Sequence, residues 1–263
     1  MRSSDRLDRP PICAILCAVT AASKKPRTKK RKPQSPRDTA SVLRELERNA
    51  SAQFRADMSA RYGIVTQARV LGTPMAKMKR IAKSIGRDRD FAEALWQTGV
   101  YEARMLASMV DEPERVTGAQ MDRWIKDCDN WALVDTLCFN LFDRTPHAFA
   151  KAAKWAKARD EFVKRAGFAL LACLAVHGRG ADEDYLALMP LIERAATDER
   201  NFVKKGVSWA LRSIGGKRSP KLRAAARELA QRLAESDDRT ERWIGRDAAK
   251  AFSKNDTRAL QAS

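Results

Sequence analysis

Apolar side chains recur every three or four residues along most of the chain beyond residue 36. The spacing is clear in the segments 81–85, 91–96 and 133–141, whereas the alternation of apolar and polar residues typical of half-buried strands is rare. Positions three and four apart share one face of an α-helix. The pattern therefore predicts an all-α fold, in which residues 37–263 form a single domain of amphipathic helices.

Glycine, proline and acidic clusters interrupt the apolar pattern and predict where helices end. The predicted interruptions are Gly72–Pro74, Gly86, Asp111–Pro113, Thr145–Pro146, Gly178–Gly180, Gly215–Gly216 and Ser236–Asp238. Their spacing leaves room for helices of ordinary length between them.

Two segments match each other: EFVKRAGFALL begins at Glu161, and NFVKKGVSWAL begins 40 residues later at Asn201. A helix pair of about 40 residues is the repeating unit of HEAT-type solenoids, which stack such pairs and expose a concave surface. The match predicts a HEAT-like helical-repeat solenoid with a concave basic cleft. A shared helical composition is the alternative explanation of the similarity.

The second segment carries an aromatic residue and cations away from its apolar stripe. At about 100° per residue, Trp209 lies roughly 140° from the centre of the stripe that contains Val203 and Val207. Lys205 and Arg212 lie on the same side as Trp209. A large aromatic residue is therefore predicted to lie on a cationic face.

Arg165 takes the position in the first segment that Lys205 takes in the second, so consecutive repeats would present cations on one surface. Cations neutralise phosphates, and an indole packs against sugars or bases. We therefore predict that Arg165, Lys205 and Arg212 bind DNA and that Trp209 lies in the cleft. Two alternatives stay open: the cations are solvated surface charges, and Trp209 packs against a neighbouring helix.

The segment CDNWALVDTLC, Cys128–Cys138, places an indole and a carboxylate one helical turn apart. If Asn130 caps the helix, Trp131 and Asp135 lie roughly 80° and 120° from the centre of its apolar stripe and share a face. A carboxylate beside an indole is partly desolvated and stays ionised only with compensating cations or hydrogen bonds nearby. Asp135 can therefore supply a localised negative charge within a positive cleft. The alternative is an ordinary surface or salt-bridged aspartate.

Composition adds a partner class to this picture. The chain has 51 Lys and Arg against 33 Asp and Glu, a formal net charge of +18, which is typical of proteins that bind polyanions, above all nucleic acid. Residues 1–36 are predicted to be a disordered basic tail, because the segment 24–38 combines proline, serine and dense like charge. The tail is either a solvated extension or an arm that contacts DNA phosphates.

Other site classes are disfavoured. The five cysteines form no CxxC pair and only two histidines could join them, so no metal is expected, and the scattered thiols suit a reducing, cytoplasmic compartment. The apolar run at residues 11–22 is too short to span a membrane. A secretory signal is the alternative reading of this run, but acidic residues and prolines precede it and a basic cluster follows it.

The chain resembles the HEAT-like-repeat DNA alkylation repair enzymes, the alkylpurine DNA glycosylases, from about Arg61 to Ile214. The resemblance is carried by RYGIVTQARVLGTPMAKMKRIAKSIG (Arg61–Gly86), LWQTGVYEARMLASMV (Leu95–Val110), CDNWALVDTLC and NFVKKGVSWALR (Asn201–Arg212). It implies a monomer without cofactor or metal that hydrolyses the N-glycosidic bond of N3- and N7-alkylated purines in double-stranded DNA, acting from the backbone side of the lesion.

The resemblance also implies roles for individual residues. The family's catalytic aspartate falls on Asp135, its two cleft tryptophans fall on Trp131 and Trp209, and a DNA-contacting arginine falls on Arg165. Two positions depart from the family pattern: Ala132 stands where a second acidic residue is common, and Gly206 stands where alanine is usual. These departures keep a second hypothesis open, a noncatalytic HEAT-repeat protein that binds duplex, branched or damaged DNA. A protein–protein scaffold is disfavoured by the net charge of +18.

Overall fold

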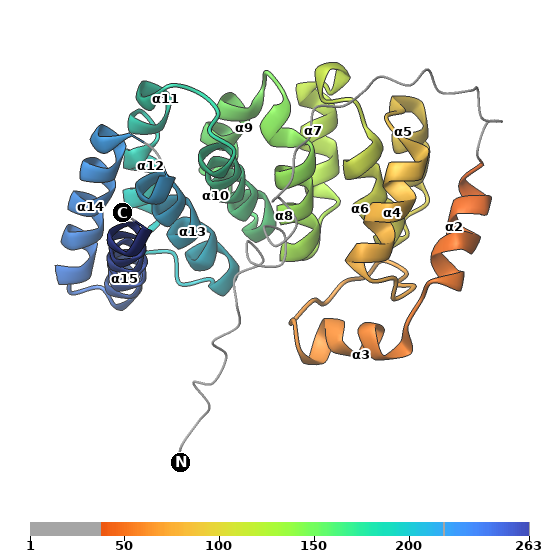
Figure 1. Ribbon diagram of the computed structural model, residues 1–263, viewed down its shortest axis with the longest axis horizontal. Coiled ribbons are helices and arrows are strands. Elements are labelled where there is room, and N and C mark those ends of the chain that lie inside the picture. Colours follow the sequence, from red (N-terminus) through yellow and green to blue (C-terminus); the bar gives the residue numbers. More distant parts are fainter. Residues whose placement is uncertain (1–37, 218, 263) are drawn as a thin grey trace, which may run out of the picture. The chain divides into compact units, whose positions relative to one another are not determined.

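The computed structural model of the protein describes residues 38–217 and 219–262 (Figure 1). These residues are helical apart from turns, connecting loops and one isolated bridge between Arg69 and Val100. The predicted all-α fold is therefore confirmed. The predicted tail, residues 1–36, lies outside the described residues, and the described part belongs to a compact unit that begins at Asp38.

The helices follow one another with short connections and two single-turn 3₁₀ segments. In chain order they are α2 (Thr39–Arg48), α3 (Ala52–Ala60), α4 (Met75–Ile85), α5 (Arg89–Gln97), α6 (Tyr101–Val110), η1 (Pro113–Arg115), α7 (Gly118–Lys126), α8 (Trp131–Asn140), η2 (Phe142–Arg144), α9 (Ala148–Trp155), α10 (Glu161–Val176), α11 (Asp182–Leu186), α12 (Met189–Ala195), α13 (Asn201–Lys217), α14 (Pro220–Glu235) and α15 (Arg239–Ala262). In this part of the chain, no helix is long and apolar enough to cross a membrane.

One row of helices runs through the described part. α4 packs against α6, α6 against α8, α8 against α10, α10 against α13, and α13 against α15. The helices between them pair with members of the row, as α5 does with α6, α9 with α10 and α14 with α15 (Figure 1). The two matching segments begin α10 and α13, and their Phe162 and Phe202 rings lie 5.5 Å apart. The sequence repeat is therefore a structural repeat of adjacent helices, as a helical-repeat solenoid requires.

Local sequence explains most helix ends. Asn130 caps α8 as predicted, and Gly86 ends α4 with a φ of 86°, a backbone conformation that glycine adopts without strain. The predicted break at Gly215–Gly216 falls in the last turn of α13, which ends at Lys217 before α14 begins at Pro220. Gly215 also allows close packing, since a Cβ atom there would collide with the Phe252 ring of α15. Its missing side chain lets α13 and α15 approach each other.

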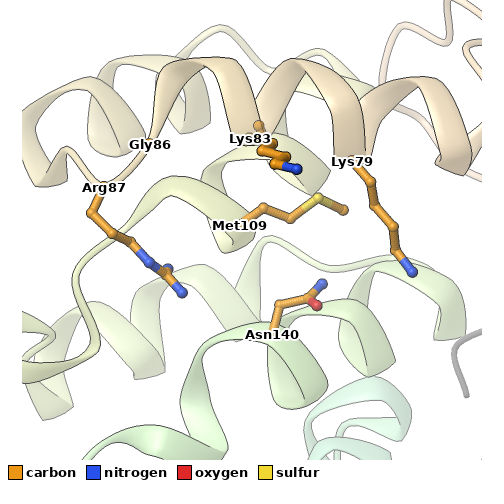
Figure 2. Close-up of a pocket in the computed structure, with 7 residues that line it drawn as sticks. Lys79, Lys83, Gly86, Arg87, Met109 and Asn140 are labelled. Carbon is orange, nitrogen blue, oxygen red and sulfur yellow. The ribbon is translucent and has the colours of Figure 1, made fainter. Parts of the chain in front are cut away.

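A pocket of about 360 Å³ opens near the C-terminal ends of α4, α6 and α8 (Figure 2). Its polar lining residues are Lys79, Lys83, Arg87 and Asn140, and Met109 contributes an apolar side chain. Neither the motifs nor the repeat in the sequence predicted this pocket, because its lining comes from three separate helices.

Candidate functional site

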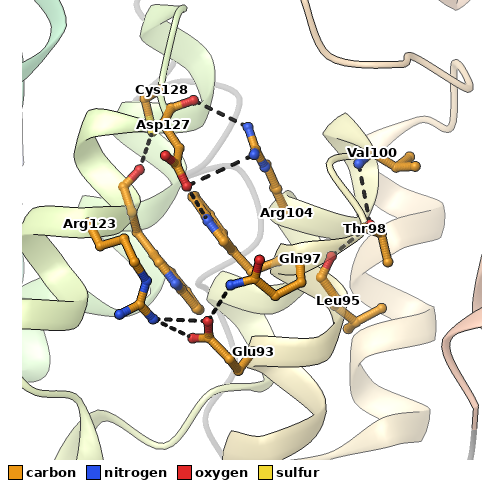
Figure 3. A network of polar contacts seen from close by, with 11 residues as sticks. Glu93, Leu95, Gln97, Thr98, Val100, Arg104, Arg123, Asp127 and Cys128 are labelled. Carbon is orange, nitrogen blue, oxygen red and sulfur yellow. Dashed lines mark hydrogen bonds and ion pairs between the residues drawn. The ribbon is translucent and has the colours of Figure 1, made fainter.

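Asp127, in the loop before α8, is held by aromatic and cationic side chains of neighbouring helices (Figure 3). Trp96 Nε1 donates to Asp127 Oδ2 at 2.8 Å, and Arg104 Nη1 donates to the Asp127 carbonyl at 3.2 Å. The Trp96 ring stacks on Trp124 with centroids 4.2 Å apart, and the Arg104 guanidinium lies 5.1 Å from the Trp96 ring centre. This network fixes the end of α7 and the start of the loop.

Asp129 anchors the same loop from the other side. Its Oδ2 atom accepts hydrogen bonds from Gln67 N at 2.6 Å and Thr66 Oγ1 at 3.0 Å. Burial raises the pKa of Asp129, but these hydrogen bonds and one from Asn130 outweigh burial and hold the pKa below its ordinary value. The next residue, Asn130, accepts from the backbone N–H groups of Ala132 and Leu133, at 3.1 and 3.0 Å. The first turn of α8 is therefore held rigidly in place.

Asp135 and Arg165 form a bidentate ion pair between α8 and α10. Arg165 Nε donates to Asp135 Oδ1 at 3.0 Å, and Arg165 Nη2 donates to Asp135 Oδ2 at 2.8 Å. Both side chains are buried, with 3% of Asp135 and 7% of Arg165 exposed. Arg165 Nη1 also donates to the Phe202 carbonyl of α13 at 2.7 Å, so one guanidinium joins three helices.

Trp131 completes this group, because the Arg165 guanidinium lies 5.9 Å from the centre of its ring. The structure thus brings together Trp131, Asp135 and Arg165 from two helices. We call these three residues the Asp135 cluster. Arg165 is the compensating cation that an ionised, desolvated Asp135 requires. Spacing could not identify it, since the two residues are 30 positions apart in the chain.

Two opposing effects act on the pKa of Asp135. Burial raises the pKa of the Asp135 carboxyl above its ordinary value, and the charge and hydrogen bonds of Arg165 oppose that rise. Both carboxyl oxygens accept from the guanidinium, which leaves neither of them as a hydroxyl donor in this geometry. The arrangement therefore holds an oriented carboxylate in a dry environment.

Trp209 lies on α13, the helix that packs against α10. Its side chain is buried, with 7% of the residue exposed, although the sequence placed it on a cationic face. Its Nε1–H group is buried without a hydrogen-bond partner among the described residues. Burial agrees with the alternative that Trp209 packs against a neighbouring helix. A buried indole N–H without a hydrogen-bond acceptor is unusual in a protein core.

The other two predicted DNA-binding cations differ in their surroundings. Arg212 Nε lies 3.1 Å from Asp247 Oδ2 and also donates to Ser208 Oγ at 3.3 Å, so it links α13 to α15. Lys205 is exposed on α13. Arg212 is therefore partly neutralised within the fold.

The two departures from the family pattern lie close to these residues. Ala132 directly follows Trp131 and is buried. Gly206 lies in the middle of α13, where a Cβ atom would meet Phe168 Cβ at 3.5 Å and Arg165 Cγ at 3.6 Å. The space at Gly206 therefore accepts a methyl group in ordinary van der Waals contact.

Within the described ranges, no group of three or more His, Cys, Asp or Glu residues is placed to hold a metal ion. Cys128, Cys138 and Cys173 are buried, and burial raises the pKa of the Cys128 and Cys138 thiols well above the ordinary value. These thiols are packing groups rather than reactive ones.

Comparisons with solved structures identify the fold. A structure described as a new family of proteins related to the HEAT-like repeat DNA glycosylases, with affinity for branched DNA structures, matches with a TM-score of 0.69 and 20% identity over 82% of this chain and 96% of that chain. A designed armadillo repeat protein in complex with the peptide (KR)4 has a TM-score of 0.38 and 15% identity, over 81% of this chain and 92% of that chain. The first match shows the HEAT-like repeat fold. Among curated proteins, none matches the chain.

The family comparison covers most of the described helices. A family model described as DNA alkylation repair enzyme matches residues 42–258, a range that contains the Asp135 cluster and Trp209. The resemblance read from the sequence is therefore confirmed. The chain belongs to the DNA alkylation repair enzyme family.

Proposed function

We propose that this protein is a DNA glycosylase that hydrolyses the N-glycosidic bond of N3- or N7-alkylated purines in double-stranded DNA. The observation that carries the proposal is the Asp135 cluster: a buried, oriented carboxylate beside an indole, in a chain of this family with a net charge of +18. Such a carboxylate is suited to stabilise a cation that forms next to it.

The reaction requires little from the protein beyond this charge. Alkylation at N3 or N7 makes the purine cationic, so the base leaves as a neutral molecule when the electron pair of the glycosidic bond moves onto it. The sugar then carries oxocarbenium-like positive charge at C1′, which the Asp135 carboxylate stabilises. Water attacks C1′, its proton passes to solvent, and an abasic site remains.

Arg165 is proposed to position Asp135 and to bind the DNA backbone. A guanidinium has five N–H donors, and the hydrogen bonds to Asp135 and Phe202 occupy three of them. The remaining two N–H groups can donate to a phosphate oxygen near the lesion. A phosphate bound there would offset part of the guanidinium charge, which otherwise opposes formation of the sugar cation.

The tryptophans and the remaining cations have supporting roles in this proposal. The faces of Trp131 and Trp209 attract the developing cation and the cationic base. Lys205 and Arg212 would contact phosphates on α13, and Arg212 would share its charge between DNA and Asp247. No metal or other cofactor takes part.

A second candidate function is binding of duplex or branched DNA without catalysis. Two observations favour it: Asp135 is already neutralised by Arg165, and Ala132 replaces an acidic residue next to Trp131. The structural relative described as having affinity for branched DNA supports the same alternative. Phosphate binding alone requires neither tryptophan nor Asp135.

The test is release of 7-methylguanine or 3-methyladenine from methylated duplex DNA by wild-type protein and by Asp135→Asn. We expect excision to fall at least about tenfold in the variant, some 1.4 kcal/mol of transition-state stabilisation, with duplex affinity little changed. Asp237→Asn, the same chemical change at an exposed position, is the matched control and should retain wild-type activity. Wild-type protein that binds duplex but releases neither base above the spontaneous rate would establish the noncatalytic alternative.

A further inference from the structure

Three cations converge on the pocket between α4, α6 and α8 (Figure 2). Lys79 and Lys83 lie one helical turn apart on α4, and Arg87 follows two residues after the helix ends. In Figure 2, Lys79 and Arg87 reach down on either side of Met109 toward Asn140. The pocket therefore combines three cationic side chains, one amide and one apolar thioether.

The charge of this pocket is largely uncompensated. The side chains of Lys79 and Lys83 make no hydrogen bond or ion pair with another residue that the structure describes. Arg87 is held by a short hydrogen bond from Nη1 to the Asp111 carbonyl. Burial lowers the pKa of the Arg87 guanidinium below its ordinary value, and the charge of Arg144 lowers it further, although Glu114, Asp111 and Glu112 oppose these effects.

Helix electrostatics explain only part of the arrangement. Cations in the last turn of a helix compensate its dipole, which accounts for Lys83 and Arg87 near the end of α4. Lys79 stands in the middle of the helix, where the dipole gives no such benefit. Dipole compensation also does not explain why three helices form a pocket that is lined by Asn140 and Met109.

We propose that this pocket binds a backbone phosphate of duplex DNA, as a contact separate from the Asp135 cluster. The lysines supply point charges, the Arg87 fork and the Asn140 amide supply directed N–H donors, and Met109 offers an apolar surface for the adjoining sugar. The proposal rests on the DNA-binding part of the proposed function but requires no glycosylase activity.

α8 connects the two places. Asn140 follows Trp131 by nine residues, about 13.5 Å along the helix, and a duplex carries roughly eight phosphates over that length. At about 100° per residue, Asn140 lies on the opposite side of α8 from Trp131, so the pocket is a contact separate from the Asp135 cluster and does not extend it.

The experiment compares two double variants of the full-length protein on undamaged duplex. Lys79→Gln/Lys83→Gln removes two cations from the pocket, and Lys77→Gln/Arg80→Gln removes two exposed cations of the same helix that do not line it. The measurement is the dissociation constant between about 50 and 200 mM salt. Loss of the one phosphate contact should make the slope of log affinity against log salt shallower by about 0.9 in the pocket variant, with a smaller change in the control.

Further measurements distinguish a phosphate of the DNA backbone from inorganic phosphate and from a terminal phosphate. At equal ionic strength, inorganic phosphate should weaken duplex binding little more than chloride does, and a continuous duplex should bind as well as one nicked with a 5′-phosphate. A marked preference for inorganic phosphate or for the terminal phosphate would overturn the assignment to the DNA backbone. If the double variant does not fold, the single exposed change Lys83→Glu makes the same comparison.

The outcomes distinguish this inference from the proposed function. Equal slopes for the pocket and control variants, with tight wild-type binding, would overturn the pocket alone. Wild-type protein that fails to bind duplex would overturn the pocket and the DNA-binding function together. Wild-type protein that releases no methylated base, with the expected difference in salt slope between the pocket and control variants, would overturn only the glycosylase proposal.

Discussion

Arg165 donates two hydrogen bonds to Asp135, one to each carboxylate oxygen, and both side chains are buried. A buried ion pair adds little net stability, because desolvation of both charges offsets their attraction. The pair therefore matters more for the orientation of the carboxylate than for the stability of the fold. Arg165 fixes the rotamer of the carboxylate, and Trp131 closes one side of the guanidinium.

Replacing Arg165 by Met should therefore destabilise the protein in a pH-dependent way. Burial would raise the pKa of Asp135 further once its partner is gone. Below the ordinary carboxyl pKa of about 3.9, Asp135 is protonated in both folded and unfolded protein, and the loss of stability caused by the substitution is smallest. As the pH rises, Asp135 loses its proton in the unfolded chain before it does so in the folded protein. The free energy of unfolding therefore falls until the pH reaches the raised pKa of Asp135 in the folded protein. We expect a loss of about 3–5 kcal/mol near pH 7 by chemical denaturation.

The double variant Asp135→Asn/Arg165→Met is the control for this prediction, because it leaves no ionisable group in the pair. Its stability should lack the decline with rising pH that the single variant shows. Identical pH profiles for the single and double variants would contradict a buried, ionised Asp135.

Glycines decide how closely the helices approach each other. A Cβ atom at Gly167 would lie 2.8 Å from Ala156 Cα, so α10 touches the backbone at the end of α9 there. The same atom at Gly206 would meet no side chain or neighbouring backbone closer than 3.5 Å. These two glycines, in the equivalent long helices α10 and α13, therefore have opposite consequences for packing.

Gly206→Ala should stabilise the protein and Gly167→Ala should destabilise it. In a helix interior, alanine is favoured over glycine by about 0.5–1 kcal/mol, and the space at Gly206 allows this gain. At Gly167, the added methyl group forces α9 and α10 apart, at a cost of about 1–3 kcal/mol. Urea denaturation of the two variants measures both effects, and a loss of stability in Gly206→Ala would show that α13 lacks the space described.

The distribution of charge concerns the whole molecule. Residues 1–36 carry ten basic and two acidic residues, and the remaining chain keeps 41 basic against 31 acidic. The folded part is thus basic without the tail, and its uncompensated cations include those of the pocket between α4, α6 and α8. We therefore propose two separate sources of affinity for DNA phosphates, one in the tail and one in the helical unit.

Protein lacking residues 1–36 should show a weaker salt dependence of DNA binding than the full chain, while its chemistry is unaltered. Each lost phosphate contact makes the slope of log affinity against log salt shallower by about 0.9, and we expect a change of at least about two. The checks are duplex titrations at several salt concentrations and single-turnover release of methylated bases at saturating protein. An unchanged slope would mean that the tail does not touch DNA.

The sequence determined much of the local structure. Periodicity predicts the helices, residue type predicts Asn130 as the cap of α8, and the apolar stripe predicts Val203 and Val207 in the core, where both are buried. The same periodicity put Trp131 and Asp135 on one helix face. These features depend on residues within a few positions of each other, so the chain sequence contains the information directly.

Reliance on a local signal limits the interpretation of Trp209. Trp209 lay outside the apolar stripe of its own helix, yet it is buried in the described structure. A single helical stripe cannot predict a helix that buries two faces.

Only the tertiary structure decided which distant residues meet. The partner of Asp135 is Arg165 on α10, the partner of Arg212 is Asp247 on α15, and the pocket joins Lys79 to Asn140 through the packing of three helices. Helical geometry fixes directions within one element, but the rotation and spacing between elements depend on every side chain at their contact. The sequence by itself therefore determined the family, the helices and the candidate carboxylate, and packing decided its charge environment.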